Sequence, residues 1–152
     1  MIVLDTNVLS EMMRAKPDPA VLAWVEAAGE LHTTALTLAE VDYGIARLAS
    51  GRRKERLAAA ASSLFTEFRD LVLPFDTAAA RRYGVIVTVR ERAGRPISTV
   101  DAQIAAICVS RRAALATRNT ADFDDTGIRI IDPWTQDRTS TSPSPGRRRT
   151  PD

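Results

Sequence analysis

The stretch that decides the fold is IVLDTNVL, residues 2–9, in which three large apolar residues lead directly into a carboxylate. Residues 2–5 are too uniformly apolar to alternate, which predicts a short strand that is buried on both faces. We expect a helix to begin immediately afterwards and to run through Val8 and Leu9. In an open α/β sheet, ligands bind where strands end and helices begin. Asp5 is therefore a candidate site residue.

Three further acids share a sequence context that is typical of a helix start. Each follows a small polar residue by three positions: Glu40 after Thr37, Asp101 after Ser98, and Asp122 after Asn119. Each acid alone also fits a helix cap, and Thr37 with Glu40 matches a capping box. Taken jointly, the four acids are expected on one rim of the sheet. Ionised carboxylates gathered there need a cation, and an all-oxygen ligand set favours Mg²⁺ or Mn²⁺.

Apolar runs alternate with helical patterns along residues 1–135. Strands are expected at 2–5, 31–36, 71–75, 113–117 and 128–131, and helices after Pro19, from Thr37 to about Ser50, and over 77–92 and 98–111. This order indicates parallel βα units in a three-layer α/β/α domain with a mostly parallel central sheet. Residues 136–152 are rich in Ser, Thr, Pro and Arg and carry too little apolar surface to fold, so a disordered tail is expected.

Composition and charge restrict the class of protein. The chain has 152 residues, 45% hydrophobic and 26% charged, which is typical of one globular domain. The net charge of +2 arises in residues 136–152, and residues 1–135 hold 17 basic and 17 acidic residues. Basic clusters that could contact phosphates are Arg52–Lys54 with Arg56, Arg81–Arg82, Arg90 with Arg92 and Arg95, and Arg111–Arg112. A lone Cys108, no signal peptide and no membrane-length apolar run predict a cytoplasmic protein.

Four segments resemble the motifs of a known family. LDTNVLSE (4–11), TLAE (37–40), PISTVDAQIAA (96–106) and ATRNTADF (116–123) resemble, in order and spacing, those of PIN-domain proteins, specifically VapC-type toxins of bacterial toxin–antitoxin pairs. DPW (132–134) resembles the end of the FitB-like branch. The resemblance implies a PIN fold, a Mg²⁺- or Mn²⁺-dependent endoribonuclease, and inhibition by a VapB-type antitoxin. It also implies a homodimer, which becomes a heterotetramer or larger assembly with the antitoxin. Because no apolar run approaches the length that spans a membrane, no membrane association is expected.

The resemblance also assigns roles to residues. Asp5, Glu40 and Asp101 match the acids of the first three motifs. Relatives place a fourth acid at the position of either Asn119 or Asp122; we favour Asp122 as the acid and Asn119 as a neutral ligand or a positioner of water.

Asn7 and Thr117 are expected to orient the carboxylates. A metal-activated water would then cleave RNA and leave a 5′-phosphate and a 3′-hydroxyl. Arg14, Arg47 and Arg118 are candidates for holding flanking phosphates.

The sequence has two other possible interpretations. A haloacid dehalogenase-type phosphatase also begins with a strand that ends in Asp, but its general acid is a second Asp two residues later, where this chain has Asn7. A catalytically inactive PIN scaffold that binds RNA or an antitoxin stays open, because Asn119 is neutral and residues 1–135 carry no net charge. The class of target RNA also stays open.

Overall fold

The computed structural model describes residues 1–135, and the expected disordered tail lies outside them. Within these residues the strands form one sheet in the order β3-β2-β1-β4-β5. Their bounds are β1 Ile2–Leu4, β2 Leu31–Thr34, β3 Val72–Leu73, β4 Ala114–Ala116 and β5 Ile130–Ile131. Every neighbouring pair is parallel, so the expected α/β class is confirmed and the sheet is wholly parallel.

The central strand β1 explains why the first residues are so apolar. Ile2 lies opposite Leu31 of β2 on one side and opposite Ala114 of β4 on the other. Side chains alternate between the two faces of a strand, and Val3 and Leu4 accordingly belong to two separate hydrophobic clusters. Both residues are completely buried. The strand therefore needs an apolar residue on each face, as the sequence predicts.

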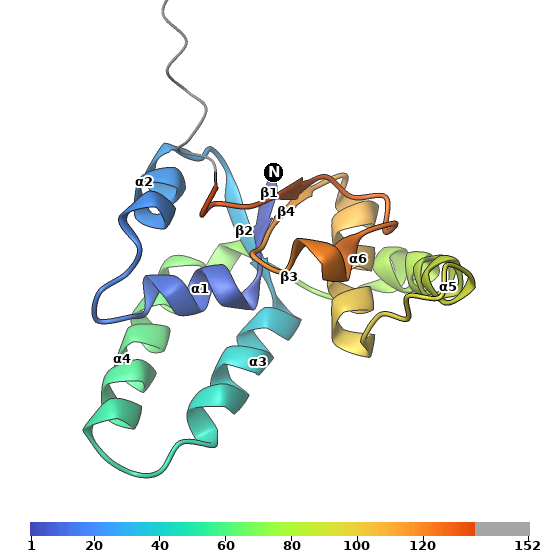
Figure 1. Cartoon of the computed structure of the whole chain (residues 1–152). Helices are drawn as coiled ribbons and strands as arrows, with labels where there is room; N and C mark the ends of the chain where they lie inside the picture. The colour runs from blue at the N-terminus through green and yellow to red at the C-terminus, as the bar shows by residue number, and fades with distance from the viewer. Residues whose placement is uncertain (136–152) are drawn as a thin grey trace, which may run out of the picture.

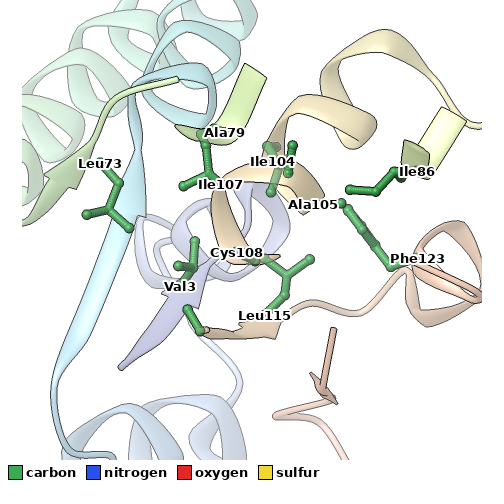
Figure 2. Packing of buried hydrophobic residues seen from close by; sticks show 12 residues of the cluster. Val3, Leu73, Ala79, Ile86, Ile104, Ala105, Ile107, Cys108, Leu115 and Phe123 are labelled. Atoms are coloured by element: carbon green, nitrogen blue, oxygen red, sulfur yellow. The ribbon is translucent and has the colours of Figure 1, made fainter. Parts of the chain in front are cut away.

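Helices cover both faces of the sheet (Figure 1). Their bounds are α1 Thr6–Met12, α2 Pro19–Ala27, α3 Ala35–Ala46, α4 Arg52–Glu67, α5 Thr77–Arg92 and α6 Thr99–Arg111, with short 3₁₀ turns η1 Arg69–Leu71 and η2 Thr120–Phe123. The Val3 cluster joins β1 and β4 to α5, α6 and η2 (Figure 2). The Leu4 cluster joins the opposite face to α1, α2, α3 and α4. None of the helices within residues 1–135 is long and apolar enough to cross a membrane.

The start of α3 differs from the expectation. The strand ends at Thr34 rather than at 36, and α3 begins at Ala35, with the Thr34 side chain accepting a 3.0 Å hydrogen bond from the Thr37 N–H. Thr34 closes the strand and caps the helix because a threonine suits both an extended backbone and an N-cap. The prediction that Thr37 and Glu40 form a capping box is therefore wrong. Glu40 lies in the second turn of α3, and its side chain is available for other contacts.

Helix α4 was not expected from the sequence, whereas the cap of α6 was. α4 has no counterpart among the expected elements, although its alanine-rich stretch has a high helix propensity. The expected cap of α6 is present: the Ser98 hydroxyl accepts from the Asp101 N–H at 3.1 Å and donates to the Asp101 carboxylate at 2.6 Å. Asp101 is thereby held at the first turn of α6, where the helix dipole favours a negative charge.

Candidate active site

A pocket of about 1050 Å³ opens where β1 ends. Its acidic lining residues are Asp5, Glu11, Glu40 and Asp101, its basic ones are Arg14, Lys16, Arg53, Arg56 and Arg118, and an apolar wall is made by Val41, Ile45, Leu48, Leu57 and Trp134. The acids come from the β1–α1 junction, α1, α3 and α6. The pocket therefore combines acids from four segments with basic residues, all five of which are exposed.

Asp5 is the buried centre of the acidic group, with 6% of its surface exposed. One carboxylate oxygen accepts from the Thr6 N–H at 2.8 Å, and the other accepts from the Thr117 hydroxyl at 2.8 Å and the Asn7 amide at 3.1 Å. Burial raises the pKa of Asp5, the hydrogen bonds from Thr117 and Thr6 lower it, and the charges of Asp101 and Glu40 raise it further. The carboxylates are thus close enough to oppose one another's ionisation.

Asn7 and Thr117 occupy the positions that an orienting role requires. The Asn7 amide also donates to the Thr117 hydroxyl at 3.2 Å, and its carbonyl oxygen accepts from the Arg118 N–H at 3.0 Å. The Thr117 hydroxyl in turn accepts from the Asn119 N–H at 3.0 Å. This network ties the chain that leaves β4 to the start of α1, and it holds Asp5 in one orientation.

Glu40 and Asp101 each bind a neighbouring hydroxyl. Thr6 donates to Glu40 at 2.5 Å, and Ser98 donates to Asp101 at 2.6 Å. In this arrangement of residues 1–135, no three His, Cys, Asp or Glu side chains are grouped closely enough to hold one metal ion. The chemistry of the donor set nevertheless suits a hard divalent cation, because Asp5, Glu40 and Asp101 present only oxygen atoms to one pocket.

The two candidates for the fourth position of the site lie in different places. Asn119 lines the pocket, whereas Asp122 is exposed in η2 and is not among the lining residues. The structure thus brings Asn119 together with the three acids and leaves Asp122 outside the group. Which of the two completes the site stays a prediction.

Two residues of the site were missed in the sequence. Thr6 donates its N–H to Asp5 and its hydroxyl to Glu40, so it joins two of the acids. Glu11 is only 6% exposed and accepts from the Asp18 N–H at 2.7 Å and from Arg14 at 3.1 Å. Glu11 follows Asn7 by four residues and therefore shares its helix face. That spacing was the signal that could have identified it.

The arginines considered for phosphate contacts separate into two groups. Arg14 and Arg118 line the pocket, as do Arg53 and Arg56 of the first basic cluster. Arg47 is not a lining residue, and its guanidinium lies 5.4 Å from the centre of the Tyr43 ring.

In two other basic clusters some of the arginines have partners within the protein. Arg90 is buried against backbone carbonyls, and Arg95 forms ion pairs with Asp124 and Asp125. Arg111 lies 2.7 Å from Asp76. Arg90 is therefore withdrawn from phosphate binding by burial. Arg95 and Arg111 are paired with acids but stay exposed, so a role for them in binding phosphates stays a prediction.

Known proteins are similar to this chain in both sequence and fold. The PIN domain profile matches residues 2–128. The chain is 39% identical over 140 residues to the VapC ribonuclease Y4jK of Sinorhizobium fredii, which covers 88% of this chain and 98% of that protein. It is 34% identical to the toxin FitB of Neisseria gonorrhoeae, and the match covers 88% of this chain and 99% of FitB. The crystal structure of FitAcB from Neisseria gonorrhoeae contains a chain with a similar fold, with a TM-score of 0.82 and 33% identity. The match covers 89% of this chain and 99% of that chain. The chain therefore belongs to the PIN-domain family, among its VapC-type members.

Proposed function

We propose that this protein is a divalent-metal-dependent endoribonuclease and the toxin of a VapBC-type toxin–antitoxin module. The observation that carries the proposal is the meeting of Asp5, Glu40 and Asp101 in one pocket, with the Asp5 pKa raised by burial and by the other two acids. Perturbed carboxylates in a cleft are typical of catalytic sites. Relatives that are named a ribonuclease and a toxin support the same function.

The residues of the pocket would have different roles in hydrolysis. Asp5 and Asp101 would hold Mg²⁺ or Mn²⁺ directly, and Glu40 with Asn119 or Asp122 would complete the site through water or a second ion. A divalent ion held there would supply Lewis-acid chemistry, which would activate a water for attack on the phosphorus and offset the negative charge on the phosphate. Water as the nucleophile makes the RNA 2′-hydroxyl unnecessary. The products would carry a 5′-phosphate and a 3′-hydroxyl.

Basic residues and partners complete the proposal. Arg14, Lys16, Arg53, Arg56 and Arg118 surround the same pocket and would bind the phosphates on either side of the scissile bond. The working unit is a cytoplasmic homodimer, and a VapB-type antitoxin binds it as a heterotetramer or a larger assembly. This part of the proposal rests on the family resemblance.

Two acids of α3 provide a matched test. Glu40 lines the pocket, whereas Asp42 is exposed on the same helix and is not among the lining residues. Glu40→Gln should lower the rate of RNA cleavage with Mn²⁺ at least about tenfold, and Asp42→Asn should cleave as the wild type does. EDTA should abolish cleavage, and sequencing of the product ends should find 5′-phosphates. Cleavage that persists in EDTA, or equal rates for the two variants, would contradict the proposal.

One observation favours the inactive scaffold as a second candidate. No three acids in residues 1–135 are close enough together to hold one ion in this arrangement. A titration with Mn²⁺ separates the two functions, because a scaffold without a metal site binds the ion weakly and binds RNA without cutting it. Saturable binding of Mn²⁺ that Asp101→Asn weakens would reject the scaffold.

A further inference from the structure

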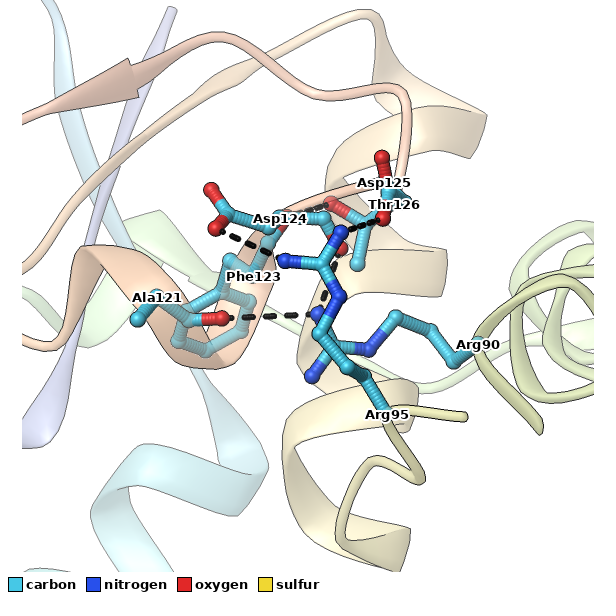
Figure 3. Close-up of polar contacts among 7 residues, drawn as sticks. All are labelled: Arg90, Arg95, Ala121, Phe123, Asp124, Asp125 and Thr126. Atoms are coloured by element: carbon cyan, nitrogen blue, oxygen red, sulfur yellow. Dashed lines mark hydrogen bonds and ion pairs between the residues drawn. The ribbon is translucent and has the colours of Figure 1, made fainter. Parts of the chain in front are cut away.

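We infer that Arg90 is a positioning residue, which holds the loop that carries Asn119 and Asp122 in place beside the acidic pocket. The inference deepens the proposed function and rests on it for its catalytic consequence. The contacts that support it are independent of any metal. They join the last turn of α5 to the segment between β4 and β5 (Figure 3).

The guanidinium of Arg90 binds the loop backbone rather than an acid. Arg90 is 4% exposed, and one of its terminal nitrogens donates to the Asp124 carbonyl at 2.7 Å and to the Ala121 carbonyl at 3.4 Å. No ion pair within residues 1–135 involves Arg90, and its Nε has no hydrogen-bond partner there. A buried charge is costly unless it is hydrogen-bonded. The contact with the loop is therefore the interaction that keeps this charge in place.

Two more contacts hold the same loop. The Arg95 side chain forms ion pairs with Asp124, at 3.3 Å, and with Asp125. The backbone N–H of Arg95 donates to the Arg90 carbonyl at 2.9 Å. Phe123 is 2% exposed and packs in the cluster that contains Ile86 of α5 (Figure 2). The end of α5 and the turn η2 are thus packed against each other, and Arg90 is buried at their contact.

The other end of the loop belongs to the acidic pocket. Asn119 donates its N–H to the Thr117 hydroxyl, which itself donates to Asp5. The Asn119 carbonyl accepts from the Asp122 N–H at 3.1 Å. Both candidates for the fourth position therefore lie in a short turn with Thr117 at one end and the carbonyls bound by Arg90 at the other. Loss of the hydrogen bonds from Arg90 to these carbonyls should loosen the turn and change the positions of Asn119 and Asp122 relative to the pocket.

The test removes the guanidinium and follows the loop and the metal separately. Arg90→Met keeps much of the side-chain volume, and Arg129→Met removes the same charge from an exposed position before β5. In metal-free protein, Arg90→Met should speed amide exchange at residues 119–124 at least about tenfold. It should also weaken Mn²⁺ binding about tenfold, since partners of metal ligands typically matter by 10- to 100-fold. Arg129→Met should match the wild type in both measurements.

Further variants show whether Arg90 acts through the turn. In an Asn119→Ala/Asp122→Ala background, Arg90→Met should weaken Mn²⁺ binding no further. Arg90→Lys, which retains a donor, should recover part of both effects, and it replaces Arg90→Met if that variant does not fold. A folded Arg90→Met protein with wild-type Mn²⁺ affinity would overturn the inference, as would a further loss in the double-alanine background. If the wild type binds no Mn²⁺, the proposed function fails, and amide exchange alone decides whether Arg90 holds the loop.

Discussion

Asp5 and Asp76 each cap a helix that follows a strand of the parallel sheet. Asp5 follows β1 and accepts from the Thr6 N–H at the start of α1, and Asp76 follows β3 and accepts from the Ala79 N–H at the start of α5. In the sequence both are an aspartate between an apolar run and a helix. Both therefore occupy an N-cap position with an extended backbone, although Asp5 accepts from the first N–H of its helix and Asp76 from the third. A larger difference between them comes from their surroundings.

The surroundings of the two acids are electrically opposite. Asp5 is buried and faces Asp101 and Glu40, and burial and these charges raise its pKa. The Asp76 side chain is 35% exposed and lies 2.7 Å from Arg111; the Ala79 N–H, chiefly, and Arg111 lower its pKa. Asp76 is placed where its charge stabilises the fold. Asp5 is placed where its charge opposes the fold, which is the arrangement expected of a functional group.

The largest expected contrast between the two acids is in RNA cleavage. Asp5→Asn should reduce the rate by at least about a hundredfold, because the partners of metal ligands alone typically contribute 10- to 100-fold. Asp76→Asn should leave the rate unchanged, because its carboxylate lies outside the pocket. Purified variants would be compared on one RNA with saturating Mn²⁺. A large loss in Asp76→Asn would mean that capping, and not the acidic pocket, explains the effect at Asp5.

A divalent ion should stabilise only those proteins in which Asp5 is intact. Binding to the folded protein adds about 2.7 kcal/mol to the free energy of unfolding when the ion is present at 100 times its dissociation constant. Mn²⁺ should therefore raise the melting temperature of the wild type and of Asp76→Asn, and it should have little effect on Asp5→Asn. Calorimetry with Mn²⁺ and with EDTA measures this. An equal rise in all three proteins would place the ion away from Asp5.

The comparison also shows how far the sequence could predict the fold. The apolar run before Asp5, the cap Ser98 and the helical pattern over 77–92 are local signals, and they place β1, α6 and α5 to within a residue or two. The role of Asp76 as the cap of α5 is not among the expectations from the sequence, in which it is typical of a turn. The edge strands β3 and β5 are only two residues long where four or five were expected. Their lengths depend on how far each pairs with its neighbour across the sheet, and this property is absent from the local pattern.

The site was predictable to a similar extent. The rule that strand ends meet at one edge is sufficient to bring Asp5, Glu40 and Asp101 together. It does not distinguish Asn119 from Asp122, because the path of their loop depends on a contact between Arg90 and carbonyls that are 31 and 34 residues away in the chain. A buried arginine and an exposed one have the same appearance in a sequence.

A smaller effect is expected when the cap of α5 is removed. Asp76→Ala loses the hydrogen bond to the Ala79 N–H and the ion pair with Arg111, and it should lower the melting temperature by a few degrees without affecting cleavage. Asp76→Asn keeps an oxygen that caps the helix and should recover part of the loss. If Asp76→Ala melts as the wild type does, the cap does not stabilise α5.

The smallest effect, and the most specific, is in the pH dependence of stability without metal. The folded pKa of Asp5 is raised above its ordinary value of 3.8, so the folded state binds that proton more tightly than the unfolded state does. The contribution of Asp5 to the free energy of unfolding is fully present below pH 3.8, and it is lost as the pH rises through the folded pKa. The folded pKa of Asp76 is lowered, so its contribution is present above 3.8 and is lost as the pH falls through the folded value.

Urea unfolding in EDTA, from about pH 3 to about pH 7, measures both contributions as differences from the variants, since groups that do not interact with the replaced acid cancel. The unfolding free energy of the wild type minus that of Asp5→Asn should decrease as the pH rises, and the difference for Asp76→Asn should increase. Equal slopes would mean that the two aspartates have similar surroundings. Opposite slopes would show that two aspartates at the same N-cap position have different effects, since the charge of Asp76 stabilises its helix and the charge of Asp5 opposes folding at the pocket.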